Sequence, residues 1–141
     1  MLSKVYITTR TTFEACHSLP KYYGKCSRLH GHSYKLEVTV SGLIDYKHME
    51  EDCERSELAR EAMVFDFSDL KGIIDRYVTN VFDHTNLNDT FSYPTAEIMA
   101  IRIYNILSPF LNRASTHIES VKLWETEDSY AEYRGEEEIS E

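Results

Sequence analysis

The order of hydrophobic patterns along the chain limits its fold more than any other feature of the sequence. Two stretches near each end alternate between apolar and polar residues and are rich in β-branched side chains, which predicts strands. Two stretches between them carry apolar residues three and four positions apart, which predicts helices. The strands are expected at 3–16, 32–41, 117–126 and 129–134, and the helices at 69–81 and 94–107. This β-β-α-α-β-β order predicts an α+β fold with a four-stranded antiparallel sheet and both helices on one face.

The length and the charge distribution limit the domain organisation and the partners. A chain of 141 residues is expected to form a single domain over 1–141, with a core that needs no disulfide bonds. Acidic residues concentrate in 43–62, expected to be a surface insertion, and in the tail 135–141. The net charge of −9 argues against nucleic-acid binding. The rest of the chain is close to neutral, so an anionic small molecule remains possible as the substrate.

The sequence also predicts where the protein works and whether it works alone. It has no apolar run of about 18 residues, so no membrane span is expected, and its first residues lack the apolar core of a signal peptide. The odd set of cysteines, Cys16, Cys26 and Cys53, favours reduced thiols and a cytoplasmic location. A four-stranded sheet leaves two open edges, which usually need a cover or a partner subunit.

Three histidines are placed where two strands could bring them together. His17 ends the first predicted strand, and His30 and His32 share one face at the start of the second. Three neutral imidazoles with one open position are the usual ligand set of a catalytic zinc ion. Spacing alone is also compatible with unrelated histidines, although Gly31 would let the backbone approach a bound ion closely.

Other polar residues each have a functional and a structural interpretation. Cys26 could be a reactive thiolate near a metal, or a loop thiol with no chemical role. The pair Asp83 and His84 could act as a general acid or base, or simply end a helix in a solvated loop. Glu125 follows the inward parity of its strand, where a ligand would satisfy it, unless the strand end reaches water. Glu97 could be an acid favoured by the dipole of the second helix.

Taken together, six short motifs resemble the pyruvoyl-tetrahydropterin synthase superfamily. In chain order they are Phe13-Glu14-Ala15-Cys16-His17, Cys26-Ser27-Arg28-Leu29-His30-Gly31-His32, Met63-Val64-Phe65-Asp66-Phe67-Ser68-Asp69-Leu70-Lys71, Asp83-His84-Thr85-Asn86-Leu87-Asn88, Pro94-Thr95-Ala96-Glu97 and Trp124-Glu125-Thr126. The resemblance implies a tunnelling fold (T-fold), in which such subunits assemble through their sheets into β-barrels, typically as a hexamer made of two trimers.

The resemblance also implies a role for each matched residue. The implied zinc ligands are His17, His30 and His32; the implied catalytic residues are Cys26, Asp83 and His84; and the implied pterin-binding residues are Glu125, Thr95 and Glu97. The implied cofactor is Zn²⁺, and the implied substrate is dihydroneopterin triphosphate. Lys21, Lys25 and Arg28 are candidates for neutralising the triphosphate.

The spacing from Cys26 to His30 favours one branch of this family. A gap of four residues resembles the enzymes that make 6-carboxy-5,6,7,8-tetrahydropterin for queuosine-type precursors, with acetaldehyde and triphosphate as co-products. The alternatives are the sister enzyme 6-pyruvoyl-tetrahydropterin synthase, a zinc hydrolase and a pterin-binding oligomer without catalysis. The length of the 43–62 insertion and Ala62, where glycine is common, depart from the family pattern.

Overall fold

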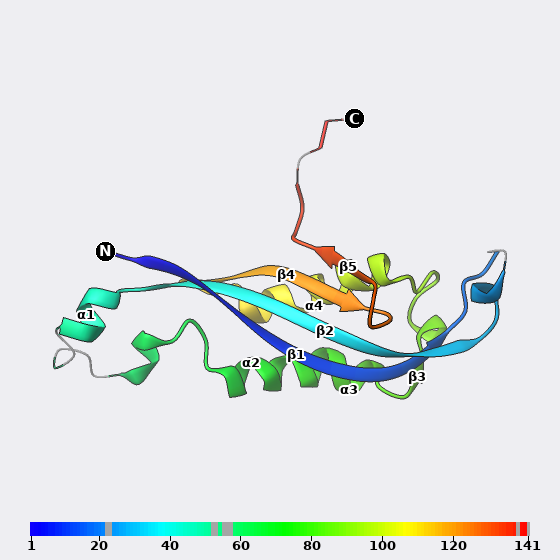
Figure 1. Ribbon diagram of the computed structural model, residues 1–141, viewed down its shortest axis with the longest axis horizontal. Helices are drawn as coiled ribbons and strands as arrows, with labels where there is room; N and C mark the ends of the chain where they lie inside the picture. Colours follow the sequence, from blue (N-terminus) through cyan, green and yellow to red (C-terminus); the bar gives the residue numbers. More distant parts are fainter. Residues whose placement is uncertain (22–23, 52–53, 55–57, 138, 141) are drawn as a thin grey trace.

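A twisted five-stranded sheet is the frame of the molecule (Figure 1). This computed structural model describes residues 1–141 except 22–23, 52–53, 55–57, 138 and 141. The strands are β1 (Ser3–His17), β2 (His30–Ile44), β3 (Thr85–Asn86), β4 (Thr116–Trp124) and β5 (Tyr130–Tyr133), in the spatial order β3-β1-β2-β4-β5. The helical segments are η1 (Lys25–Ser27), α1 (Tyr46–Glu51), η3 (Ala59–Ala62), α2 (Phe67–Ile74), η4 (Asp75–Thr79), α3 (Asn80–Phe82), η5 (Leu87–Asp89) and α4 (Ala96–Leu111).

The antiparallel pair of β1 and β2 forms the longest part of the sheet. Both strands have 15 residues, and they pair along their whole length, from Ser3 opposite Ile44 to His17 opposite His30. Because side chains alternate between the faces of a strand, Phe13 and His17 point to the same face, and both are buried there. This alternation confirms the first two predicted strands.

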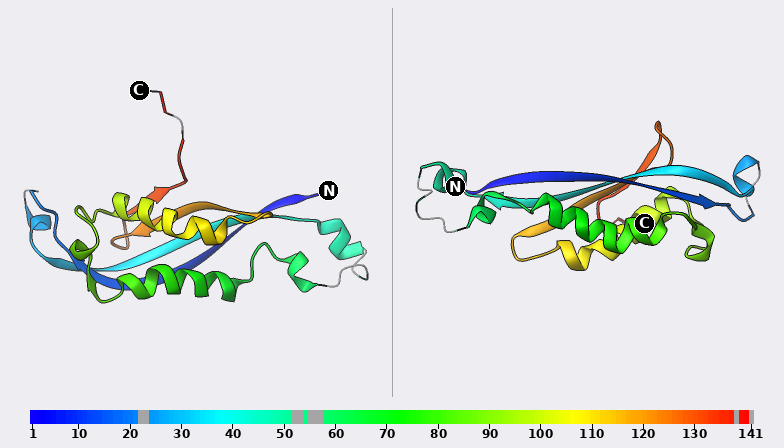
Figure 2. Two further views of the ribbon diagram at one scale, coloured as in Figure 1. Left: turned by 180° about the vertical axis from the view of Figure 1, so that it is seen from behind. Right: turned by 90° about the horizontal axis from the view of Figure 1, so that it is seen from below.

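Two helical stretches cover one face of this sheet, as Figure 2 shows. The first runs from α2 through the π-helical turn η4 to α3, and begins at Asp66, whose carboxylate accepts hydrogen bonds from the backbone N–H groups of Ser68 and Asp69. The second is α4, whose N-cap is Thr95; its hydroxyl accepts from the N–H of Ile98 at 3.2 Å. Such caps satisfy backbone donors that have no partner inside the helix. The core lies between these helices and the sheet, and the predicted α+β fold is confirmed.

The sheet differs from the prediction in its number of strands. It has five strands rather than four, because β3 pairs in parallel with β1 opposite Ala15 and Cys16. A strand of two residues has no periodicity that a sequence pattern could reveal. The described helix α4 also continues past residue 107 to Leu111, whose side chain is fully buried.

The acidic segment after β2 begins later than expected. Leu43 and Ile44 lie within β2 and pair with Lys4 and Ser3, so the predicted insertion at 43–62 overlaps the sheet by two residues. Beyond them, α1 and η3 contain no buried residues. The remainder of this segment includes residues outside the described part of the chain, as does the tail at 135–141. Among the described helices, none combines the length and apolar character needed to cross a bilayer.

The packing of α4 on the sheet gives a test of the fold. Ile103 is fully buried on α4, whereas Ile101 on the same helix is 38% exposed. We expect Ile103→Ala to lower the free energy of unfolding by about 2–5 kcal/mol, because it removes buried methyl groups and leaves a cavity. Urea denaturation of both variants measures this, with Ile101→Ala as the control. Equal losses in the two variants would contradict the described packing.

Candidate functional site

Three histidines meet at the end of the β1–β2 pair. His17 and His30 are directly opposite in the register, and His32 lies opposite Ala15, so all three side chains share one face. Their ring centroids are 4.6 to 5.0 Å apart. Glu125, just beyond the end of β4, completes the group, and one ligand atom from each of the four residues lies within 4.8 Å of the others. The structure therefore brings the three predicted metal ligands together.

Backbone carbonyls fix the orientation of two of these rings. The Nδ1 atom of His17 lies 2.8 Å from the carbonyl oxygen of Pro94, and Nδ1 of His30 lies 2.6 Å from that of Arg28. A carbonyl oxygen only accepts hydrogen bonds, so each Nδ1 carries the proton. In the neutral rings, the lone pairs are then on the Nε2 atoms of His17 and His30, which lie 3.1 Å apart. Rings held in this way are ready to bind a metal through Nε2.

The third histidine has a buried nitrogen with no hydrogen-bond partner. Nε2 of His32 is buried, and Glu125 Oε1 lies 3.0 Å from it without the geometry of a hydrogen bond. Burial lowers the pKa of His32, and His17 and His30 lower it further, while Glu125 opposes them. The shift favours the neutral imidazole, which is the form that binds metals.

This donor set fits a divalent transition metal. Three imidazole nitrogens suit zinc, copper, iron and nickel, and a carboxylate can add a further ligand or contact a bound molecule. The unpartnered Nε2 of His32 supports such an occupant, because a buried polar atom without a partner costs free energy that a bound ion would recover. The cluster is therefore the candidate metal centre of this chain.

The connection between β1 and β2 carries Cys26 near the same end of the strands. Cys26 lies in η1, is half-buried and unpaired, and its carbonyl accepts from the N–H of Leu19 at 2.9 Å. The candidate triphosphate residues Lys21, Lys25 and Arg28 are exposed in this connection. Cys16 is also a free thiol, as predicted, whereas Cys53 lies outside the described residues.

The carboxylate of Asp83 and the imidazole of His84 are in close contact at the edge of the sheet. Nδ1 of His84 lies 2.8 Å from Oδ2 of Asp83, and the N–H of Glu14 donates to Oδ1 of Asp83 at 2.9 Å. The bond from Glu14 is the main cause that lowers the pKa of Asp83, and the bond from His84 adds to it. A carboxylate that stays ionised keeps the imidazole oriented, which is the arrangement of a general acid or base.

In the described chain, Asp83 and His84 form no hydrogen bond or ion pair with the histidine cluster. The side chain of His84 is 79% exposed and borders a pocket of about 480 Å³ whose lining includes Glu14, Cys16 and Ser33, and also His32 of the cluster. Glu14 and Cys16 alternate with Ala15 and His17 along β1, so they point to the opposite face. Within the described chain, the structure does not join the pair to the candidate metal centre.

The three predicted pterin-binding residues have different surroundings. Glu125 lies at the histidine cluster, with its Oε1 also 3.9 Å from Nε2 of His17, and its N–H donates to the carbonyl of Ser129 in the turn before β5. Thr95 is the N-cap of α4, and Glu97 is exposed in the first turn of that helix. The structure therefore brings Glu125 to the candidate metal centre. The hydroxyl of Thr95 instead caps α4 by accepting a hydrogen bond from the N–H of Ile98.

Sequence reasoning missed Tyr34 as a neighbour of the site. Its hydroxyl lies 3.2 Å from Nδ1 of His17 and its ring is fully buried. Burial raises the pKa of Tyr34, and the charges of Glu125 and Cys16 raise it further, so the hydroxyl stays protonated at neutral pH. The alternation of the strand predicted at 32–41 indicates only that the Tyr34 side chain faces the core. The available signal was its position two residues after His32, which places it on the same face.

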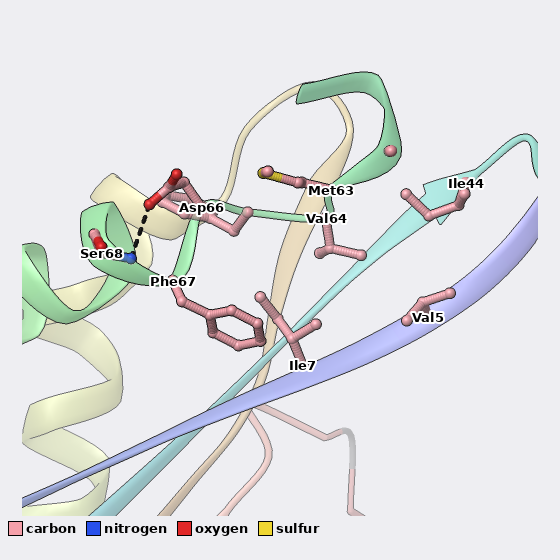
Figure 3. Close-up of a pocket in the computed structure, with 10 residues that line it drawn as sticks. Val5, Ile7, Ile44, Met63, Val64, Asp66, Phe67 and Ser68 are labelled. Carbon is pink, nitrogen blue, oxygen red and sulfur yellow. Dashed lines mark hydrogen bonds between the residues drawn. The ribbon is translucent and has the colours of Figure 1, made fainter. Parts of the chain in front are cut away.

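A second pocket lies near the opposite ends of the same two strands and offers no comparable chemistry (Figure 3). It has a volume of about 370 Å³ and its lining includes the apolar side chains of Val5, Ile7, Ile44 and Phe67. The charged residue in the lining is Asp66, which already caps α2. The pocket is therefore no alternative to the histidine cluster as a catalytic site.

Comparisons with known proteins agree with this architecture and identify the family of the chain. The family model described as 6-pyruvoyl tetrahydropterin synthase matches residues 6–136. A 6-carboxy-5,6,7,8-tetrahydropterin synthase of Haemophilus influenzae is 35% identical over 150 residues, which cover 91% of this chain and 97% of the relative. A 6-pyruvoyl tetrahydrobiopterin synthase of Poecilia reticulata is 31% identical over 148 residues, 93% of this chain and 90% of the relative.

A solved structure supports the fold independently. The 6-pyruvoyl tetrahydropterin synthase of Caenorhabditis elegans superposes with a TM-score of 0.75 at 24% identity, over 95% of this chain and 97% of that chain. The fold and the histidine cluster thus define a T-fold protein with a candidate metal centre. The chain belongs to the 6-pyruvoyl tetrahydropterin synthase family.

Removing one ring of the cluster tests the metal centre directly. We expect His30→Ala to lose bound metal, because two imidazoles and one carboxylate remain of the four groups. Elemental analysis of the purified protein measures the metal content. The control is His117→Ala on β4, which changes an exposed histidine outside the cluster. Full metal content in His30→Ala would show that the cluster is not the binding site.

Proposed function

We propose that this protein is a zinc-dependent lyase that converts 7,8-dihydroneopterin triphosphate to 6-carboxy-5,6,7,8-tetrahydropterin, with release of acetaldehyde and triphosphate. The observation that carries the proposal is the convergence of His17, His30 and His32 with their Nε2 atoms available. Membership of the family supports the pterin substrate. The proposed metal ligands are these three histidines.

The residues around the cluster can divide the chemistry between them. Zinc bound there would supply Lewis acidity toward the side-chain hydroxyls of the substrate. Glu125 can accept hydrogen bonds from the N–H groups of the pterin ring, and Thr95 and Glu97 would lie near that ring. Cys26 as a thiolate would take or relay a proton, and His84, oriented by Asp83, would act as the opposite acid or base. Lys21, Lys25 and Arg28 would neutralise the triphosphate.

The choice of branch is supported by the relatives and by one spacing. Relatives named 6-carboxy-5,6,7,8-tetrahydropterin synthase include those of Haemophilus influenzae and Bacillus subtilis, at 35% and 32% identity. Cys26 precedes His30 by four residues, the gap that favours this branch. Relatives at 31% identity named 6-pyruvoyl tetrahydrobiopterin synthase make that activity the second candidate.

The position of Asp83 and His84 supports a homo-oligomer in which two copies form one site. The pair lies at the outer edge of β1 and has no hydrogen bond or ion pair with the cluster in the described chain, while Cys26 lies in the connection between His17 and His30. We therefore infer that His84 of one copy acts at the cluster of a neighbouring copy. The family resemblance favours a hexamer built from two trimers.

The decisive experiment is product analysis. Purified protein is incubated with dihydroneopterin triphosphate, and the products are identified by mass. We expect a carboxylated tetrahydropterin together with acetaldehyde. The Cys26→Ala variant serves as the enzyme control, and loss of one proton-transfer group lowers the rate by about 10²–10⁴-fold. A pyruvoyl product would identify the sister activity instead.

Other outcomes separate the remaining alternatives. Full activity in Cys26→Ala would favour a hydrolase that uses a metal-bound water. Tight pterin binding without turnover in the wild type would favour a pterin-binding oligomer.

Mixing two inactive variants tests the shared site. We expect Cys26→Ala and His84→Ala to be inactive alone, and to regain partial activity when they are unfolded together and reassembled, because some sites then combine an intact Cys26 with an intact His84. Rates of product formation before and after mixing measure this. The control mixes Asp83→Ala with His84→Ala, which alter the same pair. No recovery in the first mixture would mean that the residues act within one chain.

A further inference from the structure

His17 differs from the other two histidines because its Nδ1 atom has two neighbours. The ring is 1% exposed, and Nδ1 lies 2.8 Å from the Pro94 carbonyl and 3.2 Å from the hydroxyl oxygen of Tyr34. The Pro94 carbonyl requires the proton on Nδ1. The N–H of His17 therefore donates mainly to Pro94, and the oxygen of Tyr34 lies within reach as a second acceptor.

Neighbouring rings hold the side chain of Tyr34 in place next to the cluster. It lies directly opposite Phe13 in the β1–β2 register, and the two rings stack with centroids 5.0 Å apart and an interplanar angle of 13°. The edges of the ring contact His17 and His32, at centroid distances of 6.2 and 5.6 Å. A fully buried ring with these contacts has little freedom to rotate its hydroxyl away from His17.

Pro94 is fixed by the beginning of α4. It immediately precedes Thr95, the N-cap whose hydroxyl accepts from the N–H of Ile98, and Pro94 itself is buried. The carbonyl that holds His17 is thus part of the same turn that starts the helix. The cap at Thr95 connects the start of α4 to the orientation of a histidine on β1.

We propose that Tyr34 is a positioning residue of the metal centre, whose hydroxyl acts with the Pro94 carbonyl to fix the ring plane and tautomer of His17. The inference rests on the proposed function, since it requires that the cluster binds a metal. Residues that contact a ligand's second nitrogen typically contribute 10–100-fold to metal affinity. Tyr34 can act in this way because its oxygen is close to His17 and its ring is locked by Phe13.

The test compares two tyrosines that each lose a buried hydroxyl. Tyr34→Phe removes the group beside His17, and Tyr104→Phe removes a hydroxyl on α4 that donates to the carbonyl of Ile118 at 3.2 Å. The affinity of the full chain for Zn²⁺ is measured by competition with a chromophoric chelator. The visible absorption of the Co²⁺-loaded protein reports the geometry of the ligands.

We expect Tyr34→Phe to bind Zn²⁺ 10–100-fold more weakly than the wild type and to change the Co²⁺ spectrum. Tyr104→Phe should leave both unchanged, although both variants lose some stability. Affinity within twofold of the wild type and an unchanged spectrum in Tyr34→Phe would overturn the proposal. If the wild type itself binds no Zn²⁺, the proposed metal centre fails, and this inference fails with it.

A second pair of variants tests the Pro94 carbonyl, the other group that the proposal assigns to the orientation of His17. Thr95→Ala removes the cap that holds Pro94 in place, whereas Thr95→Ser keeps a hydroxyl at the same position. We expect Zn²⁺ affinity to fall in Thr95→Ala and to be restored in Thr95→Ser. Equal affinity in both would show that the start of α4 does not control His17.

Discussion

The register between β1 and β2 is the constraint on which the rest of the site depends. It places His17 opposite His30, Ala15 opposite His32 and Phe13 opposite Tyr34. A shift of one residue would turn every side chain of one strand to the other face, and the three imidazoles could no longer meet. The buried stack of Phe13 and Tyr34 holds this register next to the cluster, because the slipped pairing would separate the two rings and turn one of them out of the core.

Residues outside the β1–β2 pair orient the imidazole rings and add a carboxylate to the cluster. Arg28 and Pro94 contribute only their carbonyl groups, yet these two groups decide which nitrogen of each ring faces the centre. Glu125 directly follows β4, the strand that pairs with β2 on the side away from β1. Segments distant in sequence therefore meet at one point because the sheet brings the ends of β1, β2 and β4 together.

Much of this arrangement follows from patterns of period two. Alternation predicts that His17 shares a face with Phe13 and that His30 shares one with Tyr34, and the structure confirms both. The alternation cannot predict β3, since two residues carry no period. It also cannot predict that Pro94 reaches His17, because that contact joins residues 77 positions apart.

Some residues had two interpretations that only tertiary structure separates. Thr95 matches a family motif, and the local pattern of a helix start explains the same residue as a cap. Tyr34 fits the apolar face of its strand, and its hydroxyl is a polar feature that a hydrophobicity pattern does not register. Glu125 follows the inward parity of the strand predicted at 117–126, or else stands at its end; β4 ends at Trp124, and the carboxylate of the next residue, Glu125, reaches the cluster.

The outer edge of β1 connects the fold to the proposed oligomer. In the described chain, β3 pairs with β1 only opposite Ala15 and Cys16, so the greater part of this edge has no strand beside it. Open edges carry unpaired backbone groups and favour pairing with another chain. Asp83 binds the backbone of Glu14 where this open edge ends. A copy that paired along β1 would therefore approach His84, and a reaction that needs His84 at the cluster of another copy would depend on that assembly.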